Sequence, residues 1–145
     1  MGEEKLQDSA IAGTLAIDLG STTTVVAFAA ANERSPRLLD LPPISQRVGE
    51  VPSLLWLSDE SPLLGQQVLD AGLADQDDPL LARDFKRHIG CTEIDSQDKG
   101  SQVKDDQAAR AGALLLKGIW SLLPQQLRVE RLVLTAPVET YRSYR

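Results

Sequence analysis

The sequence predicts a mixed α/β fold, and two observations carry that prediction. Short runs of β-branched or alternating apolar residues occur near the start of the chain, at 13–30, and again near its end, at 129–136, which is the pattern of strands. Between these runs, residues 105–123 present apolar side chains at helical spacing. Strands, then a helix, then a further strand are the order of a layered α/β structure.

The first three strands are expected to form an antiparallel meander. Gly13–Leu19 alternates large apolar residues with small or polar ones, and Thr24–Ala30 is a run of β-branched and small apolar residues. A turn at 20–23 joins these two segments, and a second turn at Arg34-Ser35-Pro36 leads into a third strand over Arg37–Leu41. Because the connections are short, we expect each strand to pair with the next.

The middle of the chain predicts a small inserted subdomain. After Pro42-Pro43, the segment Val51–Ser58 has the character of another strand, and Leu63–Leu73 that of a helix. A further helix is expected from Asp78 to Gly90, because Asp78 can cap it and apolar residues recur at four-residue spacing, at Leu81, Phe85 and Ile89. Cys91–Lys104 is polar and without periodicity, which predicts a loop.

The second half returns to the core. Asp105–Leu123 has acidic residues in its first turn and ends before Pro124, so it predicts a long helix. Val129–Ala136 predicts a strand that Pro137 ends. We therefore expect an N-terminal extension followed by one lobe with an inserted subdomain. The expected ranges are 1–12 for the extension, 13–145 for the lobe, 13–43 and 105–145 for its core, and 44–104 for the insert.

Composition excludes several classes of function. Fifteen Lys and Arg against 21 Asp and Glu give a formal net charge of -6, so no basic field attracts nucleic acid. Cys91 is the single cysteine and cannot form an internal disulfide. The opening residues are polar and acidic rather than a signal peptide, and no apolar run approaches the roughly 20 residues of a membrane span. We expect a cytoplasmic protein without membrane contact.

The segment Asp18-Leu19-Gly20-Ser21-Thr22-Thr23 is the strongest candidate site. A strand that ends in a carboxylate and turns sharply at a glycine gathers backbone N–H groups and hydroxyls around one point, which suits phosphate groups. Asp18 could hold a hydrated Mg²⁺, because that ion usually keeps its waters and takes few carboxylates. The competing interpretation is an ordinary hairpin turn, since the same residue types favour any tight turn.

Other candidate residues carry weaker signals. Lys86 lies on the flank of an expected helix and could be directed at a phosphate, although a solvated lysine is the simpler interpretation. His88 is the single histidine, so a zinc cluster or histidine-based triad lacks material. Trp56 and Trp120 fall on apolar stretches and are expected in the core.

Five segments of the chain, taken in order, form a pattern: Ala16–Thr22, Val51–Leu55, Leu64–Gln66, Phe85–Gly90 and Leu132–Val138. Together they resemble the heat shock protein 70 family of chaperones, whose ATPase domain has the ribonuclease H-like, actin-like fold. The first segment resembles that family's first phosphate loop, and the others resemble its Thr-Pro-Ser strand, its Val-Gly-Gln segment, its Lys-Arg-Leu-Ile-Gly helix and its Ile-Thr-Val-Pro strand.

The resemblance implies a protein that binds ATP with Mg²⁺ between two lobes and couples hydrolysis to a chaperone cycle. By this resemblance Asp18 holds the hydrated magnesium, and Lys86 meets the γ-phosphate and the attacking water. Pro137 matches a switch proline between the nucleotide and substrate domains, and Arg145 falls where an arginine relays that signal. The phosphate-wrapping residues implied are Gly20, Ser21 and Thr22, with Thr23 in place of the usual Asn.

The chain also departs from the family. The loop 91–104 is much shorter than the corresponding region, and the second phosphate loop, a further catalytic Asp, the adenosine pocket and the peptide-binding domain all belong to later parts of the family's sequence. We therefore expect a lobe incomplete at its C-terminus, which binds ATP weakly or not at all and shows no turnover. Client peptides and co-chaperones would bind through the regions it lacks. Two alternatives stay open: a sugar-kinase-like member of the same fold and a non-catalytic docking module.

Overall fold

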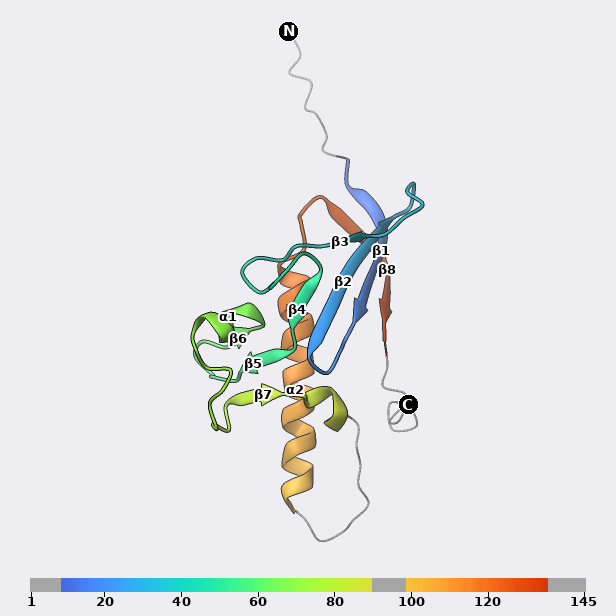
Figure 1. Ribbon diagram of the computed structural model, residues 1–145. Helices are drawn as coiled ribbons and strands as arrows, with labels where there is room; N and C mark the ends of the chain where they lie inside the picture. The colour runs from blue at the N-terminus through green and yellow to red at the C-terminus, as the bar shows by residue number, and fades with distance from the viewer. Residues whose placement is uncertain (1–8, 90–98, 136–145) are drawn as a thin grey trace.

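The computed structural model describes residues 9–89 and 99–135, with only the backbone of 99–106. It is a mixed α/β structure, as predicted, in which one long helix lies beside a twisted sheet and a smaller sheet lies to the side (Figure 1). The strands are β1 (Ile11–Asp18), β2 (Thr23–Ala30), β3 (Arg37–Leu38), β4 (Glu50–Pro52), β5 (Leu54–Trp56), β6 (Leu63–Leu64), β7 (Leu81–Arg83) and β8 (Leu127–Leu134). The helices are α1 (Gln66–Asp70), the 3₁₀ helix η1 (Phe85–His88) and α2 (Lys99–Ser121).

The large sheet contains the predicted meander. Its strand order is β3-β2-β1-β8, and β4 also pairs with β2. Strand β1 is antiparallel to β2 and parallel to β8, so the sheet is mixed. The third strand is shorter than predicted, because only Arg37–Leu38 pairs with β2.

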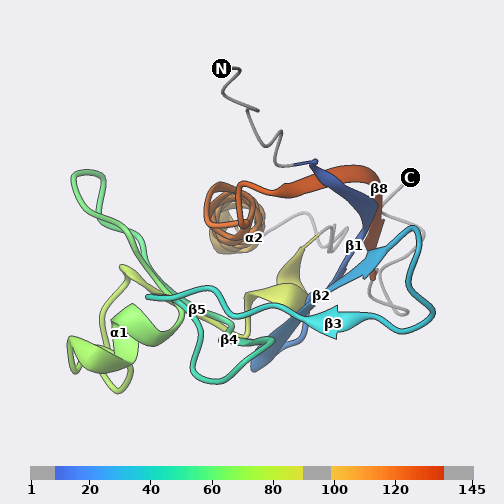
Figure 2. The same ribbon diagram turned by 90° about the horizontal axis from the view of Figure 1, so that it is seen from above.

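The core lies between this sheet and α2, which Figure 2 shows end-on beside β1. Alternate residues of β1 and β2 are buried, as the period of two in the sequence requires. From α2, residues at helical spacing reach the same cluster. The most enclosed members are Leu15, Val26, Leu41, Val51, Leu55, Ala111, Leu115 and Ile119.

The predicted strand Val51–Ser58 is divided between the two sheets. Its first part, β4, pairs with β2 in the large sheet, and its second part, β5, pairs with β6 and β7 in the small one. Ser53 is the residue between them and is 1% exposed. This division connects the two sheets directly and places a buried serine at the junction.

The helix predicted from Asp78 to Gly90 is wrong. The Asp78 carboxylate accepts a hydrogen bond from the Leu80 N–H at 2.8 Å, which forms a turn in place of a helix cap. Residues Leu81–Arg83 then pair with β5, and Asp84 has a left-handed φ of 53° that interrupts regular structure. Only the short η1 remains helical, because strand pairing with β5 outweighs the apolar spacing.

The long helix starts earlier than the sequence indicates. It begins at Lys99, inside the predicted loop, and ends at Ser121 before Pro124.

Trp120 is 53% exposed, so its predicted core position is wrong, and Trp56 is half-buried. Pro137 and Arg145 lie outside the described residues. None of the helices in the described part of the chain is long and apolar enough to cross a membrane.

Candidate functional site

The turn between β1 and β2 is the candidate site. Asp18 is the exposed last residue of β1, and Thr23 is the first of β2. At Gly20, an added Cβ would lie 2.0 Å from the Thr23 carbonyl oxygen, so the turn is too tight for a side chain there. Ser21 is half-buried and Thr22 is exposed. The predicted carboxylate and hydroxyls therefore surround one compact turn.

Ser53 fixes this turn from the buried side. Its hydroxyl donates to the Gly20 carbonyl at 2.8 Å, and its backbone N–H donates to the Thr22 carbonyl at 2.9 Å. The same hydroxyl lies 2.9 Å from the Thr24 hydroxyl, and both residues are buried. A hydroxyl has a single hydrogen, so Thr24 donates to Ser53. Ser53 thus holds the backbone carbonyls of Gly20 and Thr22 on the buried side of the turn, while residue Thr22 itself is exposed to solvent.

Thr135 fixes the turn from the neighbouring strand. It directly follows β8, and its backbone N–H donates to the Ile17 carbonyl at 3.2 Å. Its hydroxyl donates to Oδ1 of Asp18 at 2.8 Å and accepts the Leu19 N–H at 3.1 Å. Asp18 and Thr135 are 117 residues apart in sequence, so the parallel pairing of β1 with β8 is what brings them together.

Lys86 is positioned by its neighbour in η1. Phe85 is 3% exposed and belongs to the main core cluster, whereas Lys86 is half-buried. Figures 1 and 2 both show η1 at the end of the large sheet where β1 turns into β2. The segment that carries Lys86 therefore lies near that end of the sheet. Among the described residues, no hydrogen bond or ion pair joins Lys86 to Asp18. The neighbouring Arg87 pairs with Asp84 at 3.1 Å.

Asp18 suits a hydrated magnesium ion better than a directly bound metal. In the described part of the chain, no group of three or more His, Cys, Asp or Glu side chains could enclose a metal ion. A single exposed carboxylate is the kind of protein donor that Mg²⁺ takes when it keeps most of its waters. His88 is exposed. The donor set thus fits magnesium that accompanies a phosphate ligand.

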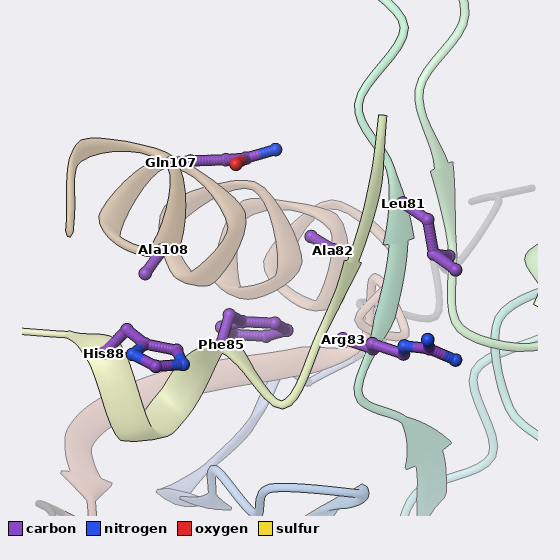
Figure 3. Close-up of a pocket in the computed structure, with 7 residues that line it drawn as sticks. All are labelled: Leu81, Ala82, Arg83, Phe85, His88, Gln107 and Ala108. Atoms are coloured by element: carbon purple, nitrogen blue, oxygen red, sulfur yellow. The ribbon is translucent and has the colours of Figure 1, made fainter. Parts of the chain in front are cut away.

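A hollow of about 170 Å³ lies between η1 and α2. Figure 3 shows Phe85 between these elements, with Gln107 and Ala108 contributed by α2. The Gln107 side-chain amide donates to the Pro79 carbonyl at 2.7 Å, so it is already engaged. This volume falls below the roughly 300 Å³ of the smallest usual ligand pockets, so the hollow is too small to enclose a nucleotide.

Ser53 and Thr135 are site residues that the sequence alone did not identify. Both belong to segments that resemble the chaperone family, but nothing in those segments indicates which side chain reaches the turn. Neither a scan against protein-family models nor a search of curated proteins gave a match to this chain.

Proposed function

We propose that this chain is the ATP-binding portion of a heat-shock-70-type molecular chaperone. One observation carries the proposal: segments that resemble that family at three distant places in the sequence meet at one turn. Ser53, from the Val-Pro-Ser segment, bonds to Gly20, and Thr135, from the Leu-Thr-Ala-Pro segment, bonds to Asp18. Segments that resemble the family only by chance would have no reason to lie together in the fold. The hydrogen bonds of Ser53 and Thr135 to the turn therefore support the resemblance.

The arrangement of strands supports the finer assignment to an actin-like ATPase lobe. That assignment expects a mixed sheet with a three-stranded meander, followed by a small inserted subdomain and a return to the sheet. The chain has the meander β1-β2-β3, then a separate three-stranded sheet, then α2 and β8. The proposed fold and the proposed ligand therefore rest on different observations.

The chemistry we propose for the turn is phosphate and magnesium binding. Gly20, Ser21 and Thr22 offer backbone N–H groups and hydroxyls to phosphate oxygens. Asp18 holds magnesium through water, and that ion, when bound, neutralises part of the phosphate charge. Thr23 continues the turn into β2. This division of roles needs only one carboxylate from the chain.

Lys86 is proposed to stabilise charge on the terminal phosphate and to orient the attacking water. Its support is its place on η1, whose Phe85 is anchored in the core. Hydrolysis and work on client peptides belong, in this proposal, to a longer cytoplasmic protein that supplies the second phosphate loop. The chain by itself is expected to bind ATP weakly and to show no turnover.

Residue-resolved NMR on the ¹⁵N-labelled chain tests the proposal. Titration with magnesium and ATP is expected to shift the amide signals of residues 19–23, with a dissociation constant on the order of 1 mM. Adenosine, which lacks phosphates, is the matched ligand control and is expected to leave these signals unchanged. The release of phosphate from ATP is measured in parallel, and its rate is expected to equal the rate without protein.

Two results would contradict the proposal. One is the absence of shifts at residues 19–23 up to about 10 mM ATP, where a millimolar site is mostly filled. The other is an equal shift of these signals with adenosine and with ATP, because a site that recognises phosphate groups cannot respond equally to a ligand that lacks them. Tight, stoichiometric binding would instead contradict the expectation that a second lobe is needed.

A further inference from the structure

The Thr135 hydroxyl joins the backbone of the turn to the Asp18 carboxylate. The Leu19 N–H donates to it at 3.1 Å, and it donates to Oδ1 of Asp18 at 2.8 Å. The direction of both bonds is fixed, because an N–H and a hydroxyl hydrogen each serve one acceptor and a carboxylate only accepts. The result is a short polar chain that ends on one carboxylate oxygen.

These two hydrogen bonds engage Oδ1 of Asp18 and do not involve Oδ2, the second carboxylate oxygen. Within the described residues no donor bonds to Oδ2 of Asp18, and the residue is exposed. A carboxylate that binds a cation through water needs a fixed orientation, and hydrogen bonds from neighbouring side chains commonly provide it. An exposed Asp without such a partner rotates between rotamers and presents its oxygens in several directions.

We propose that Thr135 is a positioning residue for magnesium binding: it holds Asp18 so that Oδ2 faces the water shell of the ion. The inference rests on the proposed function, because it assigns the ion to that site. It concerns the ion rather than the phosphates, since Thr135 bonds to the carboxylate and not to the hydroxyls of Ser21 or Thr22.

Thr135→Val tests the role of the hydroxyl with little change of shape. The substitution removes the acceptor of the Leu19 N–H as well as the donor to Asp18, so an ATP titration in the presence of a chelator is needed to separate an effect on the turn from an effect on the carboxylate. Thr135→Ser retains the hydroxyl and is the rescuing variant. Thr14→Val, in β1 and half-buried, is the matched control, because it removes a threonine hydroxyl from the same sheet away from the turn.

The measurement is the magnesium dependence of the ATP-induced NMR shifts at residues 19–23. At fixed ATP, the magnesium concentration that gives half of the shift is expected to rise about tenfold in Thr135→Val, the size expected at the low end for loss of one hydrogen bond to a charged group. Shifts with ATP in the presence of a chelator are expected to match wild type. Broadening of the Asp18 amide by Mn²⁺ in place of Mg²⁺ is expected to weaken in parallel.

Thr135→Ser and Thr14→Val are expected to titrate like wild type. Equal magnesium midpoints in wild type and Thr135→Val would overturn the inference while leaving the proposed function intact. A weaker ATP response in the chelator would also overturn it, since that pattern indicates a distorted turn rather than a misplaced carboxylate. If wild type shows no ATP response, the proposed function itself fails.

Discussion

The buried hydroxyl pair Ser53 and Thr24 gives the sharpest test of how the turn is held. Ser53→Ala removes the donor to the Gly20 carbonyl and also leaves the Thr24 hydroxyl, which is fully buried, without its partner. Loss of the bond costs about 1 kcal/mol, and an unpaired buried hydroxyl costs about 2 kcal/mol more. We therefore expect Ser53→Ala to lower the free energy of unfolding by about 3 kcal/mol.

Thr24→Val separates these two contributions. It is expected to cost about 1 kcal/mol, because Ser53 still donates to the Gly20 carbonyl. The double variant removes both hydroxyls and leaves no buried hydroxyl unpaired, so it is expected to cost about 2 kcal/mol rather than the sum of about 4 kcal/mol. The coupling between the two residues is thus about 2 kcal/mol.

Urea unfolding followed by circular dichroism gives the four free energies of this cycle. Ser121→Ala is the matched control, because the Ser121 hydroxyl also donates to a carbonyl, that of Gly118, but at an exposed position; its expected cost is below about 0.5 kcal/mol. A Ser53→Ala cost no larger than that of Ser121→Ala would refute the reasoning, and so would strictly additive costs in the double variant.

Two further substitutions test the turn and the core. Gly20→Ala is expected to destabilise the chain by about 3 kcal/mol, because the added Cβ would lie 2.0 Å from the Thr23 carbonyl oxygen. Gly72→Ala is the control and is expected to cost only about 1 kcal/mol, because Gly72 has a positive φ but no atom within 4 Å of the added Cβ. Equal costs of the two substitutions in the same urea assay would contradict the steric argument for Gly20. Leu115→Ala is expected to cost about 3 kcal/mol, because the side chain is fully buried. Trp120→Ala, at a 53% exposed position, is expected to cost less than about 1 kcal/mol. A larger cost for Trp120→Ala than for Leu115→Ala would contradict the exposed position of Trp120.

Local patterns were sufficient where one interaction determines the structure. The strand at 13–19 follows from alternation and the strand at 24–30 from its β-branched and small apolar residues, and the tight turn between them follows from Gly20, where the structure has it. Prediction failed where two patterns competed. The spacing of Leu81, Phe85 and Ile89 indicates a helix, but the edge of β5 offers Leu81–Arg83 backbone partners that the sequence does not reveal.

The partners of the turn could not be predicted because they depend on distant pairing. Ser53 reaches Gly20 across 33 residues, and Thr135 reaches Asp18 across 117. Neither distance follows from local periodicity. Each contact depends on which strand lies beside which, and that order is set by the packing of α2 and the inserted sheet on the core.

The register of β8 is what selects a threonine for the site. In the β1 ladder, Gly13 pairs with Val129 but Thr14 pairs with Arg131, so one residue, Glu130, is left out and Ile17 faces Leu134. Without that irregularity Ile17 would face Val133, and the apolar Leu134 would occupy the position beside Asp18. A one-residue shift also turns each side chain to the opposite face of a sheet. The bulge near the start of the pair therefore determines, four residues further along β1, that a hydroxyl meets the carboxylate at the turn.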